Sequence, residues 1–179
     1  MNQKTRTITQ TGLLLALLLT LQWATKPLGQ LVTGSCVNAV LAAAALLIGP
    51  GAGIFIALVS PVFAFLLGIA PQLVTVPAIM AGNAALVVVL HFLGTATPVW
   101  KKALAVIAAS ATKFLVLYAL VVKIICGTLS AGLMEQGLLK APMLQALPVM
   151  FSWPQLFTAL IGCTLASVIV PIIQKALKR

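Results

Sequence analysis

Acidic side chains are almost absent from this chain. Glu135 is the only carboxylate side chain among 179 residues, Asp does not occur at all, and 62% of the residues are apolar. A water-soluble domain carries charges of both signs over most of its surface, and this composition cannot supply them. Most of the chain must therefore be surrounded by hydrocarbon, as in an integral membrane protein.

Six apolar segments are candidate membrane-spanning helices, because a span needs roughly 20 residues at a rise of about 1.5 Å each. The second is short, and the Gly-Pro-Gly sequence at residues 49–51 predicts a tight reversal into the third. We therefore expect an all-α integral membrane fold with six transmembrane helices. These lie near Ile8–Trp23, Gly34–Ile48, Gly51–Ile69, Leu73–Leu93, Trp100–Ile125 and Gln155–Gln174.

The basic residues predict the orientation, because cytoplasmic ends and loops of membrane proteins carry the excess of Lys and Arg. With the N-terminus inside, three basic residues fall outside, Lys26, Lys123 and Lys140, and Lys113 lies within the fifth span. Both termini are then cytoplasmic. The residues predicted to be cytoplasmic are Lys4, Arg6, Lys101, Lys102, Lys175, Lys178 and Arg179.

The inventory of reactive side chains argues against an enzyme. One His, one Glu and three scattered Cys cannot form a metal site of the usual kind, and His91 has no carboxylate to orient it as a base. The chain also lacks a phosphate-binding Gly-x-x-x-x-Gly-Lys-Ser/Thr loop, so we expect no ATP hydrolysis by the chain itself and no cofactor. The excess of positive charge is explained by topology and anionic lipids, and no nucleic-acid partner is expected.

The function classes that remain are the binding and the transport of a solute. A proton- or sodium-coupled carrier normally has acidic residues within its helices, and none occurs here. A small passive pore, or a membrane carrier of another kind, stays an open alternative. A solute-binding membrane subunit that receives its energy from another protein explains the composition better.

Small residues recur at a spacing of four along the first span. The sequence reads Gly12-Leu-Leu-Leu-Ala16, followed by Thr20, which places the small side chains on one face of a helix. Such a stripe allows close approach of another helix, in a partner protein or in the same chain.

Together with six spans, cytoplasmic basic ends and long first and fifth outer connections, this stripe resembles the substrate-binding S component of an energy-coupling factor (ECF) transporter. The resemblance covers the whole chain, so residues 1–179 are expected to form a single transmembrane substrate-binding domain. In that family an Ala-x-x-x-Ala motif on the first helix docks on a transmembrane T component beside two ATPase subunits, and here Gly12 replaces the first Ala.

The resemblance implies a function as well as a fold. S components lie in a bacterial-type plasma membrane and bind a vitamin or related micronutrient from outside, through the first outer connection and the fourth to sixth helices. They then topple in the membrane as the ATPases drive uptake. Which vitamin this chain would take does not follow from any motif in it.

Lys113 and Asn83 are the strongest candidates for substrate binding. Each lies ten or eleven residues below the outer end of its span, which corresponds to a depth of roughly 15 Å. A lysine at this depth without a helical acid faces a wet cavity, loses its proton or meets an anionic ligand; snorkelling and pairing with Glu135 are the structural alternatives. Asn83 binds the same ligand or bridges two helices. We expect a carboxylate or phosphate on the substrate.

Other polar and aromatic side chains lie near the outer surface. Ser60, before Pro61, is expected to bond the carbonyl that the proline frees, and Trp153 either stacks on an aromatic substrate or belongs to an interfacial belt. The remaining candidates for substrate contact are Asn38, Gln22, Tyr118 and Gln155.

The fifth outer connection, about Cys126–Pro154, is the longest in the chain. Loops of this length are more often functional than idle, and its apolar runs predict that it folds back as a cap over the binding site. An amphipathic surface segment is the alternative.

Overall fold

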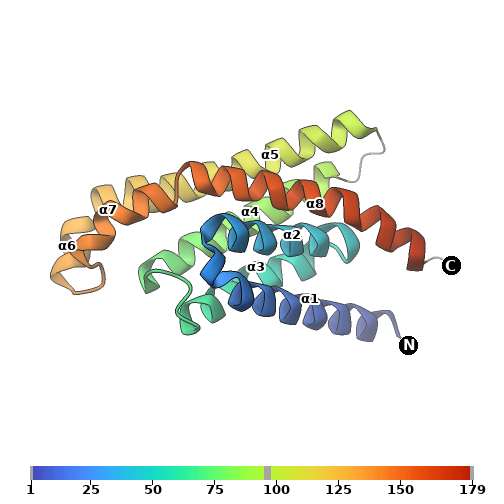
Figure 1. The fold of residues 1–179 in the computed structure, drawn as a ribbon, viewed down its shortest axis with the longest axis horizontal. Coiled ribbons are helices and arrows are strands. Elements are labelled where there is room, and N and C mark those ends of the chain that lie inside the picture. Colours follow the sequence, from blue (N-terminus) through green and yellow to red (C-terminus); the bar gives the residue numbers. More distant parts are fainter. Residues whose placement is uncertain (1, 95–97, 178–179) are drawn as a thin grey trace.

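Helical backbone follows the apolar segments along nearly the whole chain (Figure 1). The computed structural model describes residues 2–94 and 98–177. Two short 3-10 turns, Lys26–Leu28 and Leu73–Thr75, follow α1 and precede α4, and a π-helical segment, Tyr118–Thr128, continues α5. The helices are α1 (Gln3–Thr25), α2 (Gln30–Leu47), α3 (Pro50–Leu66), α4 (Val76–Gly94), α5 (Val99–Leu117), α6 (Ser130–Glu135), α7 (Ala141–Met150) and α8 (Trp153–Leu177).

Five helical stretches in the described part of the chain are long and apolar enough to cross a membrane. They are built on α1, α2, α4, α8 and the continuous α5 and π-helix. The third predicted span corresponds to α3, which has only 17 residues. At about 1.5 Å per residue α3 is about 25 Å long, whereas a hydrocarbon core is about 30 Å thick. The six predicted spans are thus five full-length helices and one shorter helix.

The predicted reversal between the second and third spans is confirmed. Only Ile48 and Gly49 separate α2 from α3, and Gly49 has a φ of 128°, which L side chains rarely adopt. Pro50 then begins α3, where its fixed φ suits the first helical position. The two helices therefore form a hairpin with almost no loop.

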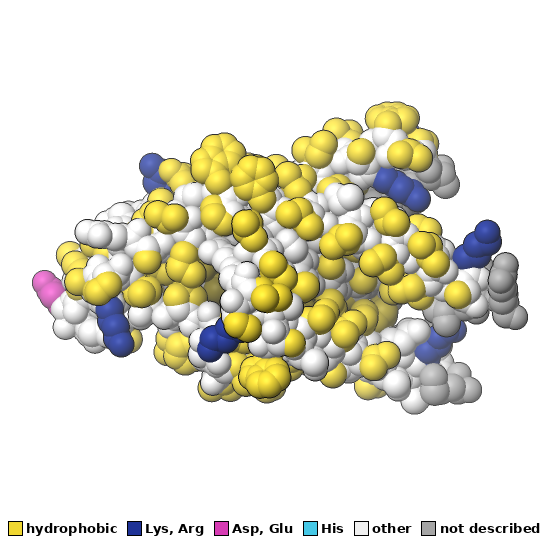
Figure 2. All heavy atoms as spheres, viewed as in Figure 1, with side chains coloured by type: hydrophobic (Ala, Val, Ile, Leu, Met, Phe, Trp, Pro, Cys, Tyr) yellow, Lys and Arg dark blue, Asp and Glu magenta, His cyan; other side chains and the backbone are white. Residues whose placement is uncertain are grey.

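Charged side chains lie toward the two ends of the molecule, and hydrophobic side chains cover the face between them (Figure 2). The start of α1 and the end of α8 share one end (Figure 1). That end carries most of the basic side chains and is cytoplasmic by the positive-inside rule. Two residues predicted to be cytoplasmic, Lys178 and Arg179, lie outside the described residues.

Two apolar cores are stacked along the molecule. The larger core lies in the membrane-spanning body and contains residues of the helices α1 through α5 and of α8. Its residues Leu41, Ile56 and Leu86 are fully buried. The smaller core lies at the outer end, where Val121 of the π-helix and Leu147 of α7 are fully buried. The segment after the π-helix therefore folds back and packs against it, as the predicted cap requires.

Helix α2 lies at the centre of the body, in contact with α1, α3, α4 and α8. Its approach to α8 depends on glycine. A Cβ atom added at Gly162 of α8 would lie 2.6 Å from both the Cβ of Asn38 and the carbonyl oxygen of Ser35. The backbones of α2 and α8 are therefore closer than any larger residue at position 162 would allow.

Gly162→Ala is expected to destabilise the protein by about 1–3 kcal/mol, because the added methyl group pushes α2 away from α8. Gly12→Ala is the matched control, since a Cβ at Gly12 of α1 meets nothing within 4 Å. Thermal unfolding in detergent should show a lower Tm for the first variant and an unchanged or higher Tm for the second. Equal Tm values would contradict the close packing.

Candidate substrate-binding site

A cavity of about 250 Å³ lies at the outer end of the body, opposite the chain termini. It is lined by the outer ends of α1, α2, α3, α4, α5 and α8, together with the end of α7. The resemblance implied the first outer connection and the fourth to sixth helices. The cavity also receives Gln22 from α1, Asn38 from α2 and Ser60 from α3.

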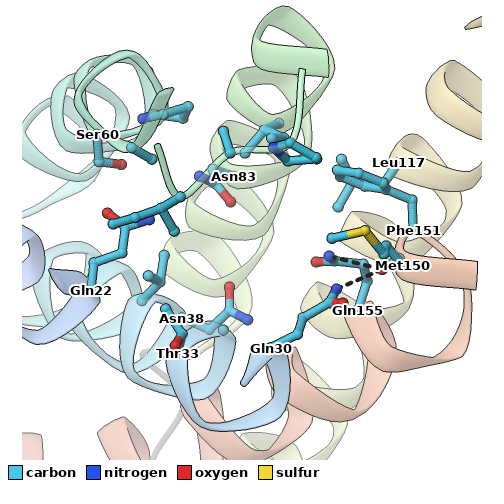
Figure 3. Close-up of a pocket in the computed structure, with 18 of the residues that line it drawn as sticks. Gln22, Gln30, Thr33, Asn38, Ser60, Asn83, Leu117, Met150, Phe151 and Gln155 are labelled. Carbon is cyan, nitrogen blue, oxygen red and sulfur yellow. Dashed lines mark hydrogen bonds between the residues drawn. The ribbon is translucent and has the colours of Figure 1, made fainter. Parts of the chain in front are cut away.

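Lys113 forms the polar centre of this cavity. Its side chain is 3% exposed, and its Nζ donates hydrogen bonds to the Oδ1 atoms of Asn38, at 2.5 Å, and Asn83, at 2.7 Å. Figure 3 shows the two amide groups facing each other from α2 and α4. An ammonium group has three N–H donors. Two are held by the asparagines, which leaves one without a partner among the described residues.

The orientation of Asn38 is fixed by a second pair of hydrogen bonds. Its Nδ2 donates to Thr158 Oγ1 at 3.3 Å, and that hydroxyl in turn donates to the carbonyl oxygen of Gln155 at 3.1 Å. Because the amide nitrogen is used in this way, the amide oxygen points to Lys113. Helix α8 therefore controls how α2 presents its oxygen to the lysine.

The charge of Lys113 is not balanced by the one acid of the chain. Glu135 is exposed at the end of α6, at the far tip of the molecule, where it is the single acidic side chain in Figure 2. Lys113 also does not snorkel, since its Nζ bonds two buried amides. Both structural alternatives for this lysine are therefore wrong.

The end of α7 is tied to the cavity wall. Gln30 Nε2 and Gln155 Nε2 both donate to the carbonyl oxygen of Met150, at 2.6 and 3.2 Å (Figure 3). Phe151, the next residue, is buried and lines the cavity. The outer segment thus closes one side of the cavity with an apolar surface, and amide groups of α2 and α8 hold it there.

The opposite side of the cavity carries Gln22 and Ser60 (Figure 3). Both are buried, and neither Gln22 Oε1 nor Ser60 Oγ has a hydrogen-bond partner among the described residues. The expected bond between Ser60 and a freed helix carbonyl is therefore wrong. Near the cytoplasmic end, in contrast, His91 Nδ1 lies 3.0 Å from the carbonyl oxygen of Ala45.

The cavity brings together five of the seven residues predicted for substrate contact, Lys113, Asn83, Asn38, Gln22 and Gln155. Tyr118 and Trp153 do not line it. The Trp153 ring is 63% exposed and stacks on Phe114 at 5.6 Å between centroids, and the Tyr118 ring lies 5.8 Å from the same Phe114 ring. Both aromatic rings thus pack against Phe114 instead of lining the cavity.

The polar residues of the cavity wall that were not predicted to contact substrate include Gln30 and Lys26. Gln30 begins α2, four residues before the predicted start of that span, and Lys26 lies in the turn after α1. Their position in the sequence could have identified them, because both belong to the first outer connection, which the resemblance assigns to substrate binding.

Within the described residues, the site offers no reactive constellation. No group of three or more His, Cys, Asp and Glu side chains is placed to hold a metal ion. The cavity provides two lysine side chains, Lys113 and Lys26, together with amide groups, hydroxyl groups and apolar walls. This set of groups binds a solute through hydrogen bonds and charge.

The small-residue stripe of α1 lies apart from the cavity. Gly12, Ala16 and Thr20 are all exposed, and no atom lies within 4 Å of a Cβ added at Gly12. The stripe therefore does not pack against another helix of this chain.

A known protein family matches this architecture. The family model for the substrate-specific component of ECF transporters matches residues 6–174, nearly the whole chain. No curated protein and no solved structure matches the chain significantly. The family consists of membrane-embedded substrate-binding subunits, which agrees with the helical body, the outward cavity and the orientation. The chain therefore belongs to the substrate-specific component family of ECF transporters.

Proposed function

We propose that this S component captures a compact anionic substrate, a vitamin or related micronutrient, from the outer side of the membrane. The observation that carries the proposal is Lys113, buried at the cavity and bonded only to neutral amide oxygens. Residues 1–179 act as one substrate-binding domain in this proposal.

The physical argument is the cost of an unneutralised charge in a membrane protein. Ionisable groups within spans are expensive, and they usually pair with an opposite charge or mark a substrate path. Asn38 and Asn83 supply oxygen atoms but no negative charge. A carboxylate or phosphate bonded to the remaining N–H would supply it, through a charge-assisted hydrogen bond that is stronger than a neutral one. Asn83 is placed to donate a second hydrogen bond from its amide nitrogen.

The shape of the cavity limits the rest of the substrate. A volume of about 250 Å³ suits a small-molecule ligand. Leu117, Ile79 and Phe151 line it with apolar surface, which suits a hydrocarbon or aromatic body beside the anionic group. The outer segment that ends at Phe151 is placed to cover such a ligand.

Energy for uptake comes, in this proposal, from a T component with two ATPase subunits that dock on α1. The exposed stripe of Gly12, Ala16 and Thr20 supports this assignment, because it presents a smooth helix face with no partner inside the chain. A passive pore would give no function to that stripe or to the buried charge of Lys113, which has no counter-charge.

Lys113→Met should weaken substrate binding roughly 10- to 100-fold, because a charge-assisted hydrogen bond contributes about 1.5–3 kcal/mol and about 1.4 kcal/mol is tenfold. The substrate is first identified by mass spectrometry of the molecules that co-purify with the wild-type protein, and is then titrated. Lys123→Met is the matched control, since Lys123 is exposed on the π-helix that continues the same span. An unchanged Kd for Lys113→Met, or a substrate without an anionic group, would contradict the proposal.

Gly12→Leu or Ala16→Leu should abolish uptake while substrate binding by the isolated protein is retained. The leucine side chain blocks close approach of a partner helix but lies away from the cavity. Gly12→Ala restores the family motif and should keep uptake, which makes it the control. Uptake by cells and co-purification of the T component and ATPases are the measurements. Retained co-purification by the leucine variants would show that docking occurs elsewhere.

A further inference from the structure

Two residues that line the cavity, Gln22 and Ser60, each have a buried polar atom without a partner among the described residues. Gln22 is 8% exposed and Ser60 is 1% exposed, and both Gln22 Oε1 and Ser60 Oγ lack a hydrogen bond among the described residues. Buried polar groups in proteins are nearly always hydrogen-bonded, and an unmade bond is costly. Two such atoms beside one cavity indicate that something entering the cavity bonds them.

These two residues belong to different helices from the lysine and its two asparagines. Gln22 comes from α1 and Ser60 from α3, whereas Lys113, Asn38 and Asn83 come from α5, α2 and α4. Figure 3 shows Gln22 and Ser60 together on one side of the cavity, across from Met150 and Gln155. The remaining lining is largely apolar. A ligand in the cavity therefore meets two sets of polar groups, Lys113 with its asparagines and Gln22 with Ser60, and apolar surface around them.

The chemistry of the second set defines its ligand group. The oxygen of a glutamine side chain only accepts hydrogen bonds, and a serine hydroxyl both donates and accepts. Gln22 Oε1 thus requires an N–H or O–H donor. That donor is neutral, because Lys26 and Lys113 both line the cavity and the one acid of the chain, Glu135, is exposed on α6. A cationic ammonium group would meet only like charges.

We propose that the substrate is a compact anion that also carries a neutral hydroxyl or amide N–H group, and that Gln22 and Ser60 bind this second group. This inference rests on the proposed function, since Lys113 holds the anionic end. In this inference, residues of α2, α4 and α5 bind the anionic group of the substrate. Residues of α1 and α3 bind its hydrogen-bond donor.

Ser110 provides an internal comparison. It is another fully buried serine, but it does not line the cavity. Replacing Ser110 and replacing Ser60 by alanine are the same chemical change, and only the second alters a residue that lines the cavity. The pair separates a role in ligand binding from the general effect of removing a buried hydroxyl.

The test uses matched pairs of small carboxylates that differ by one donor, such as 4-hydroxybenzoate with benzoate and 4-hydroxybutanoate with butanoate. Binding to the purified full chain is measured by thermal shift and titration for the wild type, Ser60→Ala, Gln22→Met and Ser110→Ala. The donor-bearing member should bind the wild type about 5-fold more tightly, as one neutral hydrogen bond corresponds to about that factor. Ser60→Ala and Gln22→Met should lose this preference, and Ser110→Ala should keep it.

A second measurement excludes a purely structural role. The Tm of ligand-free Ser60→Ala should not fall below that of the wild type, because the mutation removes an unsatisfied buried group. A clear fall would show that the hydroxyl stabilises the fold, and would overturn the inference.

The two proposals fail differently. If both members of each pair bind equally well to all four proteins, Gln22 and Ser60 bind ordered water only, and this inference is wrong while the anion site stands. If no carboxylate raises the Tm of the wild type, the anion site is wrong, and this inference falls with it.

Discussion

A lysine without a counter-charge is the constraint on which this structure depends. In a bilayer the side chain of Lys113 has to be supplied with hydrogen-bond acceptors by the protein itself. The chain has no acid in its helices, so the acceptors are the amide oxygens of Asn38 and Asn83. Those two bonds bring α2, α4 and α5 together at one depth. The cavity forms where these three helices meet.

Close packing elsewhere serves the same centre. Asn38 can bond both Lys113 and Thr158 only if α2 and α8 lie very near each other, and Gly162 permits this because it has no side chain. Small residues at helix contacts are a general means of bringing membrane helices together, since hydrocarbon surroundings provide no hydrophobic driving force between them. Here the close contact also fixes the rotation of an amide group. Packing and ligand recognition are thus coupled at one residue of α2.

The depth of a residue along its helix could be predicted from the sequence, whereas the direction in which its side chain points around the helix axis was harder to predict. Counting residues placed Asn83 and Lys113 in one layer, and their side chains are indeed bonded. Tyr118 was a candidate because it lies near the outer surface, but at about 100° per residue it points about 140° away from Lys113, while Leu117 shares the face of Lys113 and lines the cavity. The bond between Asn38 and Lys113 depends on how α2 crosses α5, which residue spacing does not determine. The missing partner of Ser60 likewise depends on which neighbours α3 meets.

Helix α1 connects the two halves of the proposed function. Gln22 points into the cavity near its outer end, and the stripe of Gly12, Ala16 and Thr20 faces away from the rest of the chain. One continuous helix, Gln3–Thr25, carries both. A substrate that bonds Gln22 would fix the rotation and depth of this helix, and a partner docked on the stripe would meet the same rigid element. Because a helix transmits rotation along its length without bending, occupancy of the cavity and the geometry of the docking face are not independent. If the proposed contacts of α1 with substrate and partner both form, they would give an energising partner a physical means to distinguish a loaded subunit from an empty one.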